Sequence, residues 1–540
     1  MSNQPIAPEG QGAEIREKQE GGVAPGVSTS TQDYRSAASD TEARPLGLRA
    51  GKDPYEDFTK QPSEIVIGLV GPLGTDTKKI REMISERLKR YGYRSEVIRI
   101  ARAIMPAMAG PARALKGSEF EQARTLIDLG NQIRKESKNV AILAIAAAAD
   151  ISRIRNNIGT KQTNAYIITS LKNPEEVAEL RKIYGSGFYL FAVHASHDKR
   201  VKFLVSSRNG MTAAEATELI ALDENEKESY GQHTGDTFHL ADFFLADENN
   251  DDKLRFSIER CLDLIFANPF ITPTFNEFSM FMAFAAAVRS ADLSRQVGAV
   301  VARGTEILST GANDCPAPGG GLYWPIFIGN QVDDVARGRD YKRGCDSNAV
   351  EKVKLIQDIV EKFPAEQQAA ARDILIKSRI ADITEYGRVV HAEMEALLAC
   401  ARSNVSCVGA TMYCSTFPCH NCAKHIIAAG IEQVIYIEPY PKSKALEFHD
   451  DAITIEKTDG VNKRVRFKPF IGVGPRQFFD LFSMSLSAGR KIDRKIDSTI
   501  ASWTPTTATP RLQMFPVSHR HFESKAVECL KQLVKDWIPQ

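Results

Sequence analysis

The 540-residue sequence has almost no excess charge of either sign, because 69 lysines and arginines are balanced by 68 aspartates and glutamates. Non-specific binding to nucleic-acid phosphates needs an excess of positive charge. The composition therefore argues against a protein that coats nucleic acid, although it leaves room for a local basic groove. The hydrophobic content of 43% is ordinary for globular proteins, and the length predicts two or three domains.

The sequence also lacks a long apolar run. The longest one, Val140–Ala149, ends at Asp150 and is too short for a bilayer, which takes about 20 residues to span. The first ten residues have no positively charged segment followed by an apolar one, so we expect no secretory signal. We therefore expect a cytoplasmic protein that does not bind membranes. In a reducing compartment, the nine cysteines are interpreted as metal-binding or catalytic groups before disulfides.

Large apolar side chains are sparse and unpatterned in residues 1–60, which are rich in Gly, Ser, Gln, Glu and Pro. A segment of this composition cannot bury enough surface to offset the entropy that it would lose on ordering. We therefore predict a disordered N-terminal tail.

Residues 61–270 have the pattern of a parallel α/β domain. Ile65–Val70 is a β-branched apolar run between glycines and predicts a buried strand. Lys78–Tyr91 has the apolar spacing of a helix, and Ser95–Ile100 and Ala165–Ser170 are further strand candidates. A strand, a glycine-rich loop, a helix and a second strand form the usual beginning of such a domain.

The glycine-rich loop, residues 71–78, has the right context for binding phosphate but not the right residues. Backbone N–H groups at the start of a helix can hold an anion. A working P-loop continues with Gly-Lys-Ser/Thr, whereas this chain has Asp76 and Thr77 where the Gly and Lys would stand. Asp76 would repel a phosphate, and Lys78 is displaced by one residue. The candidate nucleotide-binding residues are Gly71, Gly74, Thr75 and Lys78.

This region also resembles small P-loop kinases, with Arg200 in a stretch similar to their lid. Two interpretations stay open, a degenerate domain that binds a nucleotide for regulation and a structural or partner-binding remnant. An active kinase or ATPase is disfavoured, because the lysine that neutralises the transferring phosphate is missing.

Residues 271–480 predict a second unit, an α/β/α sandwich interrupted by a charged insertion at about 325–389. A helical extension is expected over 481–540. The predicted helices of the sandwich are Phe275–Ser290, His391–Arg402 and Cys419–Ala429, and its predicted strands are Val297–Val301, Glu306–Ser309, Gly409–Cys414 and Gln433–Ile437.

The strongest chemical signal is a set of metal-ligand types at two of these helix starts. His391-Ala392-Glu393 is followed, after 24 intervening residues, by Pro418-Cys419-His420-Asn421-Cys422. A catalytic zinc ion takes three nitrogen or sulfur ligands and keeps a fourth position for water. His391, Cys419 and Cys422 meet that need, since Cys-x-x-Cys at a helix start places both sulfurs on one side and favours the thiolate.

Glu393, two residues after His391, is the candidate for carrying protons to and from a water bound to the metal. Zinc lowers the pKa of a bound water to about 7, and a carboxylate is then required to carry its proton to the base and to the departing amine. The combination H-x-E with P-C-x-x-C is the signature of zinc nucleobase deaminases. The alternative is a closed structural site with a fourth ligand from Cys414, His420 or His425, which we disfavour because all four ligands would have to converge.

Four segments around these motifs are similar to deoxycytidylate deaminases, over roughly residues 273–480. They are Arg289–Val301, Ser309–Pro316, Val390–Glu393 and Tyr413–Cys419. The resemblance implies that Asn313 contacts the sugar and that the carbonyl of Ser415 receives the exocyclic amine. The family usually has Gly where this chain has Asp314. The alternative for Asn313 is a turn residue, because Asn before Asp and Pro suits a turn.

The whole chain, an N-terminal P-loop-like parallel-sheet domain followed by a cytidine-deaminase-like α/β/α sandwich and then Gly472–Arg476, resembles the bacterial anti-phage dCTP/dCMP deaminases. The resemblance implies a hydrolase with Zn²⁺ that destroys free deoxycytidine nucleotides during infection. It also implies an inhibitory small RNA as a partner and a homo-oligomeric assembly. The sequence does not separate dCMP from dCTP as the substrate.

Two other functions compete with this one. A deaminase that edits cytosine or adenosine in nucleic acid would need a basic channel with aromatic side chains, and the modest basic stretch Gly489–Lys495 suits a solvated helix face better. An RNA-regulated toxin or sensor could use the fold for recognition alone. The intact Glu393 counts against that function, because a binding module needs no proton shuttle.

Overall fold

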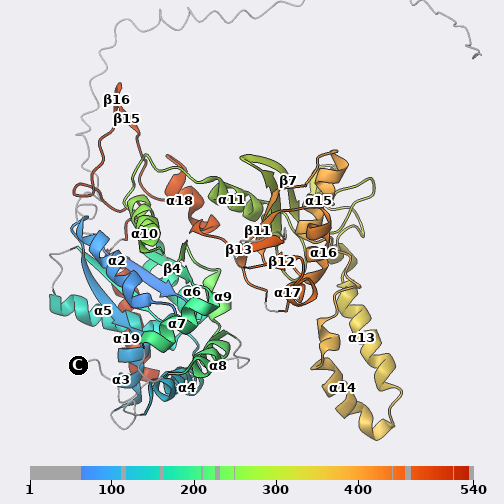
Figure 1. Ribbon diagram of the computed structural model, residues 1–540, viewed down its shortest axis with the longest axis horizontal. Coiled ribbons are helices and arrows are strands. Elements are labelled where there is room, and N and C mark those ends of the chain that lie inside the picture. Colours follow the sequence, from blue (N-terminus) through green and yellow to red (C-terminus); the bar gives the residue numbers. More distant parts are fainter. Residues whose placement is uncertain are drawn as a thin grey trace, which may run out of the picture. The chain divides into compact units, whose positions relative to one another are not determined.

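The computed structural model describes residues 63–110, 117–158, 163–207, 211–224, 231–248, 250–440, 442–455, 464–514 and 516–533. The predicted disordered tail lies outside these residues. Two six-stranded sheets with helices on their faces organise the described chain (Figure 1). None of the helices in the described ranges is both long enough and apolar enough to cross a membrane.

The first sheet confirms the predicted parallel α/β arrangement. Its strand order is β14-β5-β4-β1-β3-β2, with all neighbours parallel except β14, which pairs antiparallel with β5. The strands are β1 (Ile65–Val70), β2 (Arg94–Arg99), β3 (Asn164–Thr169), β4 (Phe188–His194), β5 (Phe243–Ala246) and β14 (Gly472–Val473). The short β14 comes from the segment assigned by sequence to the second unit, so the boundaries of the two units interlock.

Successive side chains of β1 point to opposite faces of the sheet and enter two different hydrophobic cores, so the sheet lies between two helical layers. Ile65 and Ile67 belong to a core that contains residues of α2 (Thr77–Lys89) and α10 (Asp251–Ile265). Val66 and Val70, which point to the other face, belong to a core with residues of α5 (Ile142–Ile158), α6 (Pro174–Tyr184) and α19 (Pro516–Leu533). Strands buried on both faces explain why the sequence reads as continuous apolar runs here.

The C-terminal helix α19 is held on α5 by a buried group of charges. The Arg155 guanidinium contacts Glu64 at 2.7 Å and also binds Glu523 of α19. His519 of the same helix lies 3.4 Å from Glu64. Charges are buried in this way only when they are paired, so the pairs fix where α19 docks. Of the segment after residue 482 that the structure describes, only α19 is helical, and a hairpin of β15 (Lys495–Ile496) and β16 (Thr499–Ile500) precedes it.

The second sheet is the middle layer of an α/β/α sandwich. Its order is β12-β13-β11-β10-β6-β7, with β7 and β10 antiparallel to β6 and the other neighbours parallel. Helix α11 (Phe275–Val288) covers one face, and α15 (Ala392–Arg402) and α16 (His420–Ala428) cover the other. The strands are β6 (Gly298–Arg303), β7 (Glu306–Ala312), β10 (Thr411–Thr416), β11 (Gln433–Glu438), β12 (Ile453–Thr454) and β13 (Val465–Pro469).

Two glycines let the helices of this sandwich approach the strands closely. A Cβ at Gly298 would lie 1.8 Å from the carbonyl oxygen of Ala283 in α11. A Cβ at Gly311 would lie 2.1 Å from the carbonyl oxygen of Ala392 in α15. Because real Cβ atoms do not come so near, only glycine fits at these positions.

The insertion forms a small helical unit of its own. Its helices α13 (Ser347–Val360) and α14 (Gln368–Ile376) lie side by side (Figure 1) around a core of Ile356, Val360 and Ala371. Ahead of them come β8 (Ile326–Ile328), β9 (Gln331–Asp333) and α12 (Asp340–Arg343). The other α-helices in the described ranges are α3 (Met105–Ala109), α4 (Glu119–Ser137), α7 (His197–Ser207), α8 (Ala213–Glu224), α9 (Thr234–Phe238), α17 (Ala445–Phe448) and α18 (Phe478–Phe482).

Candidate active site

The three predicted metal ligands come together at the first turns of α15 and α16. His391 is the N-cap of α15, Cys419 is the N-cap of α16, and Cys422 lies in the first turn of α16. Nδ1 of His391 lies 3.4 Å from Sγ of Cys419 and 3.3 Å from Sγ of Cys422. The backbone N–H of Cys422 donates to Sγ of Cys419, which fixes the turn.

The geometry of these three side chains fits a zinc ion. Their ligand atoms all lie within 4.8 Å of one another. Tetrahedral Zn–S bonds of about 2.3 Å and a Zn–N bond of about 2.0 Å would separate the nitrogen from each sulfur by about 3.5 Å, close to the separations found. Neither Cys414 nor His420 belongs to the group. The set therefore has the three ligands of a catalytic site and not the four of a closed structural one.

Among the three side chains, the electrostatics favour the metal-binding form of Cys419 alone, because the pKa of His391 and that of Cys422 are both raised. The hydrogen bond with Cys422, followed by that with His391, lowers the pKa of Cys419 to about 4. The thiolate is the form of cysteine that ligates metals. The hydrogen bond with Cys419 raises the pKa of His391 to about 9. Burial raises the pKa of Glu393, the second residue of α15, while the nearby charge of His391 lowers it.

A cavity of about 510 Å³ opens over this group. His391, Glu393 and Cys419 line it, together with Asn313 and residues of the loop 292–297. The insertion supplies a further wall, which sequence reasoning missed. No local pattern could have indicated this wall, because the placement of the insertion depends on contacts between residues far apart in the chain.

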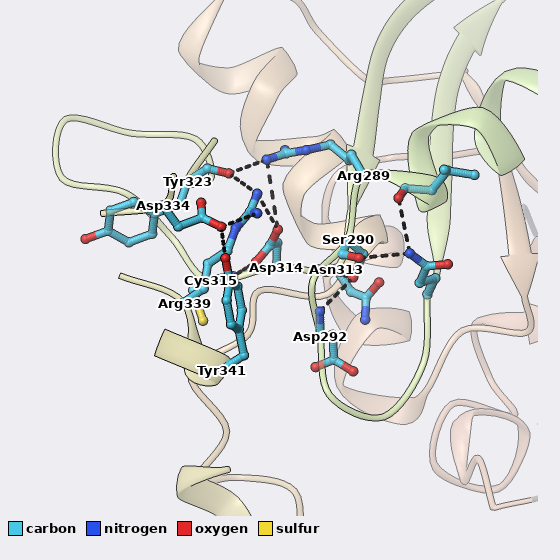
Figure 2. Close-up of polar contacts among 12 residues, drawn as sticks. Arg289, Ser290, Asp292, Asn313, Asp314, Cys315, Tyr323, Asp334, Arg339 and Tyr341 are labelled. Atoms are coloured by element: carbon cyan, nitrogen blue, oxygen red, sulfur yellow. Dashed lines mark hydrogen bonds and ion pairs between the residues drawn. The ribbon is translucent and has the colours of Figure 1, made fainter. Parts of the chain in front are cut away.

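Asn313 lies at the cavity with its side chain already engaged by the neighbouring loop (Figure 2). Its Oδ1 accepts from the N–H of Val297 at 2.7 Å, and its Nδ2 donates to the carbonyl of Arg295 at 2.8 Å. Ser290 Oγ donates to the carbonyl of Asn313. Asn313 thus shapes the loop 292–297, and its contact with a sugar stays a prediction.

Ser415 is buried at the end of β10 and is not among the residues that line the cavity, whereas its neighbour Thr416 is. Its Oγ accepts from the N–H of Gly298 at 3.0 Å, which ties β10 to the start of β6. The prediction for Ser415 concerns its main-chain carbonyl, and it also stays a prediction.

Asp314 stands where the resembling family usually has Gly, and its backbone is not in the left-handed region. Its N–H donates to the carbonyl of Val390 at 3.2 Å, and the N–H of Val390 donates back at 2.9 Å. Since Val390 precedes His391, this pairing holds the first metal ligand. The Asp314 carboxylate is buried and lies 3.1 Å from Nη2 of Arg339, in the insertion (Figure 2).

The four candidate nucleotide-binding residues of the first unit line a separate cavity of about 670 Å³. It lies at the carboxyl ends of β1, β2 and β3, where Leu69, Arg99 and Thr169 also line it. Gly74 has a φ of +89°, and a Cβ there would lie 2.7 Å from Cβ of Arg200. The four residues are Gly71, Gly74, Thr75 and Lys78.

The hydrogen bonds of this loop differ from those of an open anion cradle. The N–H of Leu73 donates to the buried carboxylate of Asp223 at 2.7 Å, and the N–H of Thr75 donates to the carbonyl of Pro72. Asp76 caps α2 by accepting from the N–H of Lys79 at 3.0 Å. Several loop donors are therefore used within the chain.

Comparisons with known proteins agree with the site. The family model described as "Cytidine and deoxycytidylate deaminase zinc-binding region" matches residues 273–438, which include all three ligands and Glu393. The deoxycytidylate deaminase of Enterobacteria phage T2 is 30% identical over 170 residues, 30% of this chain and 79% of that protein. That of Mycobacterium phage D29 is 30% identical over 165 residues, 30% of this chain and 94% of that protein.

The match extends to a eukaryotic relative. The deoxycytidylate deaminase of Saccharomyces cerevisiae is 23% identical over 314 residues, 56% of this chain and 82% of that protein. The crystal structure of dCMP deaminase from cyanophage S-TIM5 aligns at 19% identity and a TM-score of 0.21 over 37% of this chain and all of that one; so low a score carries no argument. The chain belongs to the deoxycytidylate deaminase family. It is a hydrolytic deaminase, and Zn²⁺ is its cofactor.

Proposed function

We propose that this enzyme deaminates free deoxycytidine nucleotides, dCMP and dCTP, to the deoxyuridine nucleotides with release of ammonia. The observation that carries the proposal is the group of His391, Cys419 and Cys422 beside the buried carboxyl of Glu393, at the base of a cavity of about 510 Å³. A cavity of that size suits a single small molecule.

The proposed roles of the residues follow from their positions. His391, Cys419 and Cys422 hold Zn²⁺, which when bound lowers the pKa of a water molecule to about 7. Glu393 takes a proton from the attacking water and delivers it to N3 of the cytosine ring as oxygen bonds to C4. It then takes the second proton from the hydroxyl on C4 and delivers it to the exocyclic amine, which leaves as ammonia while the C4 carbonyl forms. Asn313 and the carbonyl of Ser415 are the proposed contacts to the sugar and the amine.

Free nucleotides are favoured over nucleic acid by the composition and by the relatives, which are named as deoxycytidylate deaminases. The basic stretch Gly489–Lys495 is absent from the residues that line the cavity. A sensor without catalysis is disfavoured because the carboxyl of Glu393 is kept beside the ligands, where a binding module has no use for it.

The proposed biological role is depletion of deoxycytidine nucleotides in the cytoplasm of a bacterium under phage attack. Inhibition by a small RNA and assembly into a homo-oligomer belong to the same proposal. Its support is the resemblance of the whole chain to anti-phage deaminases. Wild-type and Glu393→Ala proteins expressed in phage-challenged cells would test it, since only the wild type should lower the dCTP pool and plaque formation.

For the first unit we propose a regulatory nucleotide site in a P-loop kinase-like domain. Its support is the 670 Å³ cavity at the carboxyl edge of a parallel sheet, where such sheets bind ligands. Calorimetric titration with ATP and GTP tests it, with Lys78→Ala as the variant. Nucleotide binding by the wild type that is weakened in Lys78→Ala would support the proposal. No binding by the wild type would instead favour the interpretation of this domain as a structural remnant.

The central experiment incubates the zinc-loaded protein separately with dCMP, dCTP, deoxycytidine and a cytosine-containing single-stranded DNA. Ammonia release and the uracil product are measured, with Glu393→Ala as the control. We expect conversion of the nucleotides and its loss in the control. Conversion of the DNA alone would overturn the proposal in favour of editing.

A further inference from the structure

The insertion is part of the substrate cavity and not an appendage to it. Residues from three of its segments line the cavity beside His391 and Glu393. They come from the start of α12 and α13, from the turn Arg379–Asp382, and from the stretch that leads into His391. A nucleotide whose base lies at the metal group would therefore meet the insertion with its outer parts.

The insertion is fixed in place by buried ion pairs, so its position is defined. Arg339, with a side chain only 5% exposed, lies 3.1 Å from Asp314 and 3.2 Å from Asp334 (Figure 2). The Tyr341 hydroxyl donates to the same Asp334 oxygen that Arg339 contacts. The Arg289 guanidinium of the α11 end stacks on Trp324 at 3.7 Å. These contacts join the insertion to the residue that pairs with Val390, next to the metal ligand.

The acidic side chains of the cavity are engaged by the protein. Asp292 accepts from the N–H of Ser294 and Arg295, and Asp346 caps α13. Asp340 pairs with Arg388 at 2.5 Å. These carboxylates hold the loops of the cavity, and the charge of Asp340 is offset by Arg388.

Three further cations line the cavity besides Arg295, which pairs with Glu438, and Arg388. Arg379 is an exposed residue of the insertion, and Lys442 and Lys444 follow β11 in the chain. The hydrogen bond from Lys444, followed by the charges of Lys444 and Arg379, lowers the pKa of Glu447. Arg379 and Lys444 are thus near one carboxylate, and their positive charges converge on one region of the rim.

From this arrangement we propose that the insertion determines specificity for the phosphate chain, with Arg379 contacting the β- and γ-phosphates of dCTP together with Lys442 and Lys444. The inference rests on the proposed function and deepens it by making the triphosphate the preferred substrate. A guanidinium presents a planar pair of donors that matches phosphate oxygens. On this assignment the α-phosphate, the only phosphate of dCMP, does not reach Arg379, so Arg379 discriminates between the two nucleotides.

The test compares Arg379→Ala and Arg379→Lys with Arg372→Ala. Arg372 is the matched control, because it is an exposed arginine of the same insertion that does not line the cavity. Each zinc-loaded protein is assayed with dCTP and with dCMP. For Arg379→Ala we expect kcat/KM on dCTP to fall about tenfold or more through KM, as loss of a charge-assisted hydrogen bond implies. The value for dCMP should change less than about threefold.

Arg379→Lys should recover part of the loss on dCTP, and Arg372→Ala should match the wild type. An equal loss on both nucleotides, or no change in their ratio, would overturn the inference. Because Arg379 is exposed, its replacement should leave the unfolding temperature unchanged, which separates a specificity effect from misfolding. A wild-type protein that converts neither nucleotide would instead refute the proposed function.

An independent variant tests whether the buried ion pairs of Arg339 hold the insertion in position. Arg339→Met removes the ion pairs with Asp314 and Asp334 while keeping the length of the side chain. We expect the preference for dCTP over dCMP to fall toward the value of Arg379→Ala, because the insertion then no longer holds Arg379 in position. An unchanged preference, in a protein that still binds stoichiometric zinc, would show that the ion pairs of Arg339 do not determine the position of Arg379.

Discussion

Replacing Gly311 with Ala should damage the active site through packing alone. Gly311 lies in β7, and a Cβ there would lie 2.1 Å from the carbonyl oxygen of Ala392, where real contacts are at least 3.0 Å. The helix α15 must therefore move by about 1 Å. That helix begins next to His391 and carries Glu393. A displacement of about 1 Å can reduce a rate about 100-fold, and overpacking of this kind costs about 1–3 kcal/mol of stability.

The assay is kcat/KM for dCMP with excess zinc, together with zinc content and the free energy of unfolding in urea. The matched control is Gly235→Ala, since a Cβ there would have only one neighbour, at 3.7 Å, and needs no positive φ. We expect Gly311→Ala to lose most of its activity and the control to keep it. Activity of Gly311→Ala within about threefold of the wild type, with unchanged stability, would refute the argument that α15 has no room to move.

Three further predictions concern the metal and the buried charges. Cys422→Ser should lose stoichiometric zinc and more activity than the 10–100-fold that outer partners of a metal ligand cost, as measured by metal analysis and ammonia release. Arg155→Met should cost about 3–5 kcal/mol in urea unfolding, because it leaves Glu64 and Glu523 buried without their partner. Glu64 itself should make stability depend on pH. Burial opposes its charge, but the hydrogen bonds with His519 and Arg155 outweigh this and lower its pKa to about 2. Its folded pKa lies below the unfolded value of about 4.5, so its contribution of about 3 kcal/mol is present above pH 5 and is lost as the pH falls toward 2. In Glu64→Gln this part of the pH dependence should be absent.

The sequence predicted best what depends on neighbouring residues. His391 and Glu393 lie two residues apart at one helix start, and Cys419 and Cys422 lie three apart at another. Local spacing therefore decides which side chains share a face, and only the meeting of the two helices needed the fold. The continuous run of β-branched apolar residues likewise predicted β1, because a strand buried on both faces is apolar throughout.

Features that depend on distant contacts could not be predicted. The strand β14, only Gly472–Val473, joins the first sheet through β5, more than 200 residues away. Docking of α19 depends on the contact between Arg155 and Glu523, which cannot be predicted from either segment alone. The sequence predicted the insertion at about 325–389 only as a charged segment. Its function as a cavity wall depends on single pairs such as Arg339 with Asp314.

Asp314 joins the insertion to the backbone beside the metal group. Its backbone pairs with Val390 and so holds the residue before His391. This pairing does not need a side chain at position 314. With a glycine there, Arg339 would have no carboxylate from this loop, and the buried guanidinium would lack one of its two acidic partners. Burying such a charge with too few partners is unfavourable, so the aspartate and the insertion are expected to occur together. The same residue thereby transmits the position of the insertion to the loop that shapes the substrate site, through its neighbour Asn313.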